Sequence, residues 1–335
     1  MKRALVLLAL ALGGRPAVAA DTPAIIQRML DAASTLSYRG HVVQIEGDQA
    51  QSLHLLHRAG ADGGEDRVRS LQGTYWELRR SGESCQVALI NARPAHDEAL
   101  VAAAFPSLLP RRLQNLAEFY EFAPVGGGRL ADHVAEFTLA RPRDEFRFAY
   151  LLGTDAATGL LLKASLIDSH GQVLRQVFFV DLEVVPTLAD DEWKHEFGNT
   201  PPKLQWSEHT LGKRLPASAV PWPVGPLPAG FAVSNYLRHR APHSDQEVEQ
   251  LTISDGLATV SAFIDSPAPG EHTLLGAGRV LDMPAYGAQL AGRHVTVLGA
   301  APMATLQHVV KALTPDAAGT TTPPAKLPAA STEHP

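Results

Sequence analysis

The most constraining feature of this sequence is a succession of short apolar segments, each ended by Gly, Asp or Asn. Five such segments lie between Tyr38 and Asn91, and more follow from His133 to Val185. Turn residues at such short intervals favour strands joined by tight connections. Short connections join antiparallel neighbours, because parallel strands need crossovers of about a dozen residues or more. The pattern therefore predicts a large antiparallel sheet over residues 21–197.

Two stretches interrupt this rhythm. Residues 21–38 have apolar side chains at helical spacing after Pro23, which predicts an N-terminal helix. Residues 98–122 predict helical turns broken by prolines, and Gly126–Gly128 predicts a flexible turn. A curved sheet with helices on its concave side can enclose an apolar cavity, although an ordinary packed core fits the composition equally well. The candidate cavity-lining residues are Phe105, Leu108, Leu109, Phe119, Phe122, Phe137, Phe146 and Phe148.

The stretch LTISDGLATVSAFID, residues 251–265, predicts a β-hairpin in the second half of the chain. An Asp-Gly pair between alternating hydrophobic residues is a strong hairpin signal, because Gly accepts a positive φ. With a two-residue loop, Ile253 lies opposite Ala258 and Leu251 lies opposite Val260. These four side chains then share a buried face. The turn Ser254–Asp255–Gly256 is either purely structural or a contact for a binding partner.

The remaining segments define the boundaries. Lys2 and Arg3 precede an apolar run that ends in AVAA, which predicts a secretory signal peptide over residues 1–20. A Pro-rich stretch predicts a linker over residues 198–226. A smaller β-rich domain is expected over residues 227–313. The final residues, 314–335, are rich in Pro, Thr and Ala and predict a disordered tail.

Composition and motifs narrow the possible chemistry. A net charge of −6 argues against nucleic acid as a partner, because phosphates require clustered Lys and Arg. Cys85 is the one cysteine, so the chain has no intrachain disulfide. In HLLH, the odd spacing of His54 and His57 places the two rings on opposite faces of a strand, which disfavours a metal site. We therefore predict no catalytic, cofactor-binding or metal-ligating residues. A hydrolase triad assembled from distant residues stays open, because triads are recognised by geometry.

The chain resembles the RseB/MucB family of periplasmic negative regulators of the sigma-E envelope-stress pathway. The resemblance rests on YRGHVV after the N-terminal helix, on LPAGF at residues 227–231, and on SDGLATVSAFID at 254–265. It also rests on GRHVTVLGAAPMATLQHVVKAL at residues 292–313. It covers nearly all of the chain after the signal peptide, with the two domains in the same order.

This resemblance implies a mainly β fold with helices (α+β). The N-terminal domain would be an unclosed antiparallel β-barrel like the LolA-type lipoprotein carriers, followed by the smaller β-rich domain. It implies a periplasmic protein that binds the periplasmic part of a membrane-spanning anti-sigma factor (RseA or MucA). Binding would shield that partner from the site-1 protease until lipopolysaccharide or lipid acyl chains release it, with no enzymatic step. A periplasmic lipid or lipoprotein carrier is the alternative, and homo-oligomers are compatible with either function.

Overall fold

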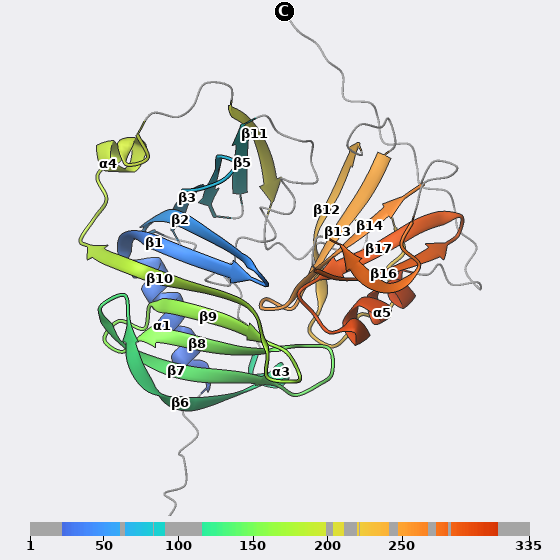
Figure 1. The fold of residues 1–335 in the computed structure, drawn as a ribbon, viewed down its shortest axis with the longest axis horizontal. Coiled ribbons are helices and arrows are strands. Elements are labelled where there is room, and N and C mark those ends of the chain that lie inside the picture. Colours follow the sequence, from blue (N-terminus) through green and yellow to red (C-terminus); the bar gives the residue numbers. More distant parts are fainter. Residues whose placement is uncertain are drawn as a thin grey trace, which may run out of the picture.

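The computed structural model describes residues 22–60, 64–82, 84–90, 116–198, 204–210, 220, 222–240, 247–266, 273–280 and 283–313. Two antiparallel sheets make up most of these residues, together with short helices (Figure 1). No helix in these stretches is long and apolar enough to cross a membrane. The predicted signal peptide, the predicted tail and three candidate residues (Phe105, Leu108 and Leu109) lie outside the described residues.

The larger sheet contains eleven strands in the order β11-β5-β4-β3-β2-β1-β10-β9-β8-β7-β6. All neighbouring strands are antiparallel, and β1 pairs with β10 to join the two halves of the sheet. Because β11 and β6 are both edge strands, the sheet is not closed into a barrel, which confirms the predicted fold class. The strands are β1 (Ser37–Glu46), β2 (Gln49–Arg58), β3 (Glu65–Ser70), β4 (Trp76–Ser81), β5 (Ser84–Ile90), β6 (Tyr120–Leu130), β7 (His133–Pro142), β8 (Ala149–Asp155), β9 (Leu161–Ile167), β10 (Val173–Val185) and β11 (Leu204–Thr210).

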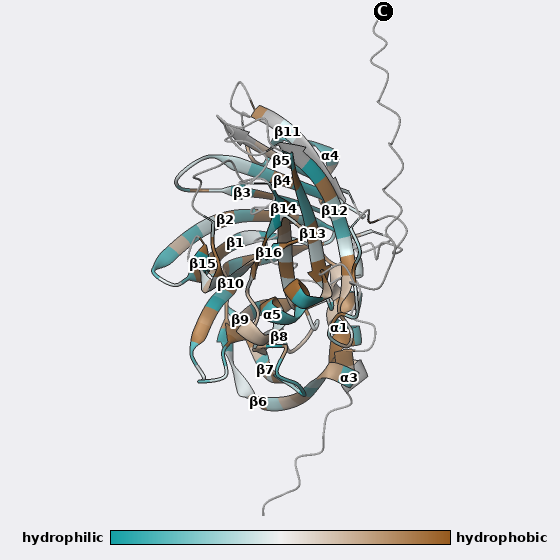
Figure 2. Ribbon diagram, turned by 90° about the vertical axis from the view of Figure 1, so that its right-hand side faces the viewer, coloured by the Kyte–Doolittle hydropathy of each residue, from teal (hydrophilic) through white to brown (hydrophobic). Residues whose placement is uncertain are grey.

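The core of this sheet lies under helix α1 (Thr22–Thr35), as the helical spacing of its apolar residues predicts. Ile26, Met29, Ala32 and Ala33 lie on one side of the helix and are buried against the strands. Apolar residues are concentrated on this helix and on the strands that it covers (Figure 2). Burying a side chain of the size of Met29 contributes about 1.5–3 kcal/mol, so α1 is held mainly by its apolar face. The short helix α3 (Leu116–Phe119) leads into β6, and α4 (Asp190–His195) follows β10.

The second sheet has six strands in the order β12-β13-β14-β17-β16-β15. Helix α5 (Met303–Ala312) packs on one face of this sheet, where Leu306, Val309 and Val310 are buried. This smaller β-rich sheet confirms the second part of the predicted fold. The strands are β12 (Ala232–Arg240), β13 (Glu247–Ser254), β14 (Thr259–Asp265), β15 (Gly276–Val280), β16 (Met283–Leu290) and β17 (Arg293–Gly299).

Strand β6 was not predicted from the sequence, which assigned Gly126–Gly128 to a flexible turn. All three glycines pair with β7, after a register shift between Pro124 and Gly126. An edge strand tolerates such residues because one of its sides needs no ladder hydrogen bonds. A Cβ on Gly128 would lie 3.0 Å from the Phe137 ring, so the missing side chain makes room for that ring.

Part of the predicted linker has regular structure. Strand β11 pairs with β5 along its whole length and extends the larger sheet by one strand. Val220 and Trp222 belong to the core of the second sheet. The Trp222 indole nitrogen donates a hydrogen bond to the Leu313 carbonyl over 2.8 Å, which ties this segment to the end of α5. The Pro-rich composition did not reveal these contacts, because they depend on strands and helices far away in the sequence.

The predicted hairpin forms between β13 and β14, but its predicted register is wrong. Ile253 pairs with Val260, not with Ala258, so the loop has four residues, 255–258. The Asp255 carboxylate accepts hydrogen bonds from the backbone of Leu257 and Ala258 at 2.9 and 2.7 Å. The Asp255 carboxylate thus pairs two backbone N–H groups of the four-residue loop. A two-residue turn would have no such N–H groups to pair. The shift is two residues, so the predicted side chains still share the buried face.

Candidate functional site

Arg147 forms the most extensive polar contact between the two sheets. It precedes β8, and its side chain is completely buried. The guanidinium donates to the carboxylate of Asp255 in the hairpin loop of the second sheet, and to Asp144 beside it in the chain. It also donates to the carbonyl of Ala229, in the segment before β12. Removing one partner of a buried ion pair costs about 3–5 kcal/mol, because it leaves the other charge buried and unpaired. The Arg147 guanidinium therefore depends on groups from both domains.

Two aromatic rings, one from each domain, pack against the Arg147 guanidinium. The Arg147 Cζ lies 4.5 Å from the ring centroid of Phe119 and 4.7 Å from that of Phe231. Cation–π attraction strengthens when water is excluded, as it is at this buried position. Gly230 packs against the Phe119 ring, since a Cβ at Gly230 would lie 2.5 Å from an atom of that ring. Helix α3 of the first domain therefore contributes one ring, and the segment before β12 contributes the other.

The hairpin loop also enters the apolar core of the first sheet. Leu257 packs against the same buried cluster as α1 and the strands under it. Its carbonyl accepts a hydrogen bond from the Tyr150 hydroxyl over 3.0 Å. On the other side, Phe146 packs into the core of the second sheet, where its carbonyl accepts from the Thr305 hydroxyl over 2.6 Å. Each domain thus packs a partly buried apolar side chain against the core of the other. We call this set of contacts the junction: Phe119, Phe146, Arg147, Tyr150, Phe231, Asp255 and Leu257.

Tyr120 lies beside the junction with an unsatisfied hydroxyl. Its side chain is fully buried, and within the described part of the chain its oxygen has no hydrogen-bond partner. Its ring is 6.3 Å from that of Tyr150 and 5.9 Å from the Arg147 Cζ. Burial, followed by the nearby charge of Asp255, raises the pKa of this phenol above its usual range. An unpaired buried hydroxyl costs about 1–3 kcal/mol, so this part of the core is less stable than full pairing would make it.

The structure separates the candidate cavity-lining residues into two groups. Phe122 and Phe137 pack in the core under α1, and Phe119 lies at the edge of that core against Arg147. Phe146 belongs to the core of the other sheet, 5.2 Å from the ring of His308. Phe148 is half-buried just before β8. The sequence did not single out Arg147 or Tyr150, because their partners lie more than a hundred residues away.

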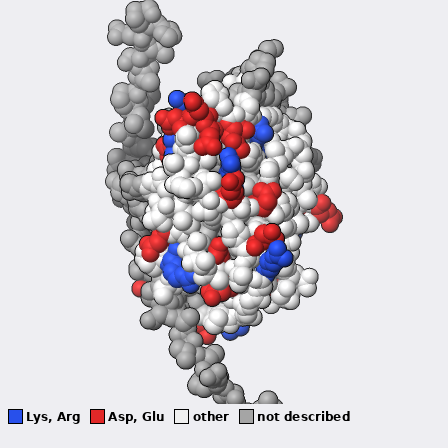
Figure 3. All heavy atoms as spheres, turned by 90° about the vertical axis from the view of Figure 1, so that its left-hand side faces the viewer, with Lys and Arg blue, Asp and Glu red and all other residues white. Residues whose placement is uncertain are grey.

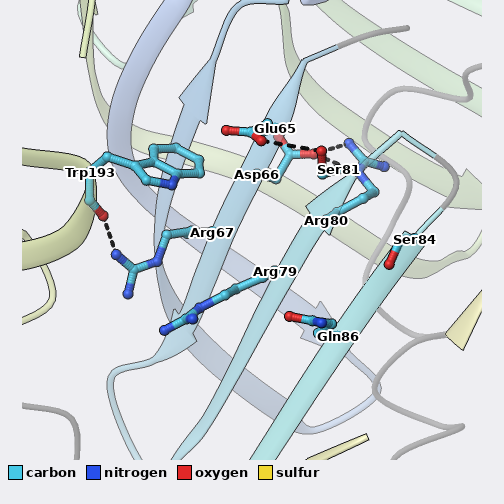
Figure 4. Close-up of a pocket in the computed structure, with 9 residues that line it drawn as sticks. All are labelled: Glu65, Asp66, Arg67, Arg79, Arg80, Ser81, Ser84, Gln86 and Trp193. Carbon is cyan, nitrogen blue, oxygen red and sulfur yellow. Dashed lines mark hydrogen bonds and ion pairs between the residues drawn. The ribbon is translucent and has the colours of Figure 1, made fainter. Parts of the chain in front are cut away.

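The opposite face of the larger sheet carries a charged layer beneath α4. Acidic side chains gather where this helix lies (Figure 3), and its first turn contains Asp190, Asp191 and Glu192. Arg58 lies 4.5 Å from the Trp193 ring and pairs with Asp190. A polar pocket of about 230 Å³ opens beside Trp193 (Figure 4). Its lining residues are Glu65, Asp66, Arg67, Arg79, Arg80, Ser81, Ser84, Gln86 and Trp193.

The guanidinium groups of this pocket are occupied by ion pairs within the protein. Arg67 and Arg79 both donate to one carboxylate oxygen of Glu77, at 2.6 and 3.0 Å. Arg80 pairs with Asp66, which also accepts a hydrogen bond from His57. These pairs account for the burial of so many charged side chains. The pocket is therefore built from structural ion pairs of strands β3 and β4.

His54 and His57 lie on opposite faces of β2, as their spacing predicts. One nitrogen of His57 lies 2.6 Å from the carboxylate of Asp66, and the other lies 2.6 Å from the carbonyl of Ala33 in α1. Burial alone would raise the pKa of Asp66, but the charge of Arg80 and the hydrogen bonds from His57 and Arg80 lower it to about 2. His54 stacks on His41 on the other face, with the ring centroids 4.7 Å apart. Among the described residues, no cluster of three His, Cys, Asp or Glu side chains is placed to hold a metal ion.

These features define a two-domain β-sheet protein, in which a large open antiparallel sheet is joined to a smaller one through a buried polar junction. Residues 21–197 match the MucB/RseB N-terminal domain and residues 216–314 match the MucB/RseB C-terminal domain. The chain therefore belongs to the MucB/RseB family.

Curated relatives and a solved structure agree with this assignment. The chain is 29% identical to the sigma factor AlgU regulatory protein MucB of Pseudomonas aeruginosa, over 90% of this chain and 93% of the relative. It is 23% identical to the sigma-E factor regulatory protein RseB of Haemophilus influenzae, over 85% and 89%. The structure of the Pseudomonas aeruginosa MucA/MucB complex matches with a TM-score of 0.67 and 26% identity, over 88% of this chain and 98% of that chain. The relatives are thus named as regulatory proteins and not as enzymes.

Proposed function

We propose that this protein is a periplasmic negative regulator of a sigma factor. It binds the periplasmic segment of a membrane-spanning anti-sigma factor and shields that segment from the site-1 protease. Lipopolysaccharide or lipid acyl chains bind to the regulator and release the partner. The observation that carries this proposal is the match of both family domains, in order, to a protein whose structure is solved with MucA.

The two sites of this proposal lie on different parts of the molecule. The core under α1 supplies the apolar surface for acyl chains, with Phe119, Phe122 and Phe137 at that core. The second domain supplies the surface for the anti-sigma segment. The turn Ser254–Asp255–Gly256, which the sequence offered as a candidate contact, faces the first domain, where the Asp255 side chain is completely buried against Arg147. Two ligands that favour different arrangements of one protein weaken each other's binding by the same factor. A coupling of about 5- to 150-fold is typical of such pairs.

Calorimetric titration tests this function directly. The chain from residue 21 onward is titrated with the periplasmic segment of the anti-sigma factor from the same organism, with and without purified lipopolysaccharide. We expect binding that lipopolysaccharide weakens at least fivefold, together with protection of the segment from the site-1 protease. Absence of binding under both conditions would contradict the proposal. Lipid co-purifying with the protein would then favour the carrier function.

Export to the periplasm has its own test. The predicted signal peptide, residues 1–20, directs cleavage after Ala19 or Ala20, so the mature N-terminus identifies the processing site. We expect fractionation of the native host to place the processed chain in the periplasm. Recovery of an uncleaved chain in the cytoplasm would overturn this part of the proposal.

A further inference from the structure

The junction places the hairpin loop of the second domain directly on the core of the first. Leu257 packs against the cluster that contains Tyr120 and Phe122, and Phe119 lies at the edge of the same cluster. Phe119 also forms one wall around the Arg147 guanidinium. An apolar ligand that entered this core would therefore meet the side chains that hold the loop and the ion pair.

Two carboxylates share the Arg147 guanidinium, and they belong to different domains. Asp144 comes from the first domain and is partly exposed, whereas the side chain of Asp255 comes from the second domain and is completely buried. The pair with Asp144 is local and leaves the domains independent. The pair with Asp255 links them, and it needs the aromatic walls to exclude water, because a buried ion pair depends on excellent geometry.

We propose that the Arg147–Asp255 ion pair is the switch through which an acyl chain in the first domain controls the arrangement of the second. An acyl chain that enters beside Phe119 and Tyr120 displaces Leu257 from the core. The loop moves, Asp255 leaves Arg147, and Asp144 remains as the partner of the guanidinium. This inference rests on the proposed function for its ligand class, a lipid acyl chain, and it adds the residues that couple the two domains.

The test measures the distance between the domains and needs no binding partner. Spin labels are attached to cysteines replacing two exposed residues, Val134 in β7 and Gln289 in β16, in a chain in which buried Cys85 is changed to Ala. We expect one narrow distance distribution for this parent. Purified lipopolysaccharide should shift or broaden it, and deacylated lipopolysaccharide should leave it unchanged.

Asp255→Asn is the decisive variant. Asn keeps an oxygen to accept the backbone hydrogen bonds of the loop but removes the charge that pairs with Arg147. We expect a broad distribution without lipid and no further change when lipopolysaccharide is added. Asp144→Asn is the matched control, because it removes a carboxylate from the same guanidinium without breaking the link between domains. It should keep the narrow distribution of the parent without lipid. Its response to lipopolysaccharide should be no larger than that of the parent, because the guanidinium then lacks its second carboxylate.

Arg147→Gln gives the same information if Asp255→Asn fails to fold, which circular dichroism shows. A narrow, lipid-sensitive distribution in either folded variant would overturn the proposal, as would a parent that does not respond to lipopolysaccharide. The effect on partner binding is a separate readout. We expect lipopolysaccharide to lower the affinity of the parent for the anti-sigma segment at least fivefold. In Asp255→Asn, lipopolysaccharide should change that affinity less than twofold. A parent that never binds the segment contradicts the regulator function, while the distance measurements still decide the role of the ion pair.

Discussion

Gly256 carries the backbone conformation on which the hairpin loop depends. Its φ of 106° lies in a region that β-branched residues resist. We expect Gly256→Val to destabilise the second domain by about 1–3 kcal/mol, measured by urea unfolding. Ala277→Val is the control, because Ala277 is exposed on a strand of the same domain and should change stability by less than about 0.5 kcal/mol. Wild-type stability of Gly256→Val would show that the loop does not require this conformation.

His54 makes the stability of the first domain depend on pH. Burial, helped by the charges of His41 and Arg69, lowers its pKa to about 4, whereas an unfolded histidine has a pKa of about 6.5. The unfolded chain therefore binds the proton more tightly, so the stabilising contribution is complete above pH 6.5 and is lost as the pH falls toward 4. We expect the free energy of unfolding to decrease across this range, and His54→Asn to reduce that decrease.

The control for this pH dependence is His170→Asn, because His170 lies exposed in a turn. It should leave the wild-type pH profile unchanged. Asp66 acts in a separate range, because its lowered pKa makes its contribution disappear only between about pH 4 and pH 2. An identical slope between pH 6.5 and 4 in wild type and His54→Asn would contradict the role given to His54.

At the scale of elements, α1 is held by one apolar face and by His57. Met29 is 1% exposed at the centre of that face. We expect Met29→Ala to lower the free energy of unfolding by about 2–5 kcal/mol, because the truncation leaves a cavity under the helix. Gln27→Ala, on the exposed side of the same helix, should change it by less than about 0.5 kcal/mol. Equal effects of the two substitutions would show that α1 does not cover the core.

The predicted and observed elements agree best where a pattern is local. Strands β7 and β10 both lie in the stretch from His133 to Val185, where the sequence predicted further strands from short apolar segments separated by turn residues. Strand β6 was missed, since its glycines signal a turn when only neighbouring residues are considered. The hairpin register was also wrong, because the Ser254 and Asp255 side chains support a longer loop than the Asp-Gly pair alone predicts.

At the scale of the whole molecule, the junction makes each domain depend on the other. Phe146 precedes β8 of the first sheet but packs in the core of the second. We expect Phe146→Ala to increase hydrogen exchange in β13, β14 and α5, with a loss of roughly 2 kcal/mol for a half-buried phenylalanine. Phe137→Ala is the matched control and should increase exchange only in the first sheet. Increased exchange confined to the first sheet in both variants would contradict the shared core.

The sequence alone determined most of the strands, the buried face of α1 and the resemblance to a regulator family, because these depend on residues close together in the chain. The periods of helix and strand, and the turn residues between them, are read directly from neighbouring positions. Only the tertiary structure decided that β11 joins the larger sheet and that Arg147 pairs with Asp255. Such contacts depend on how two sheets meet, and no local pattern marks an arginine whose partner lies 108 residues away.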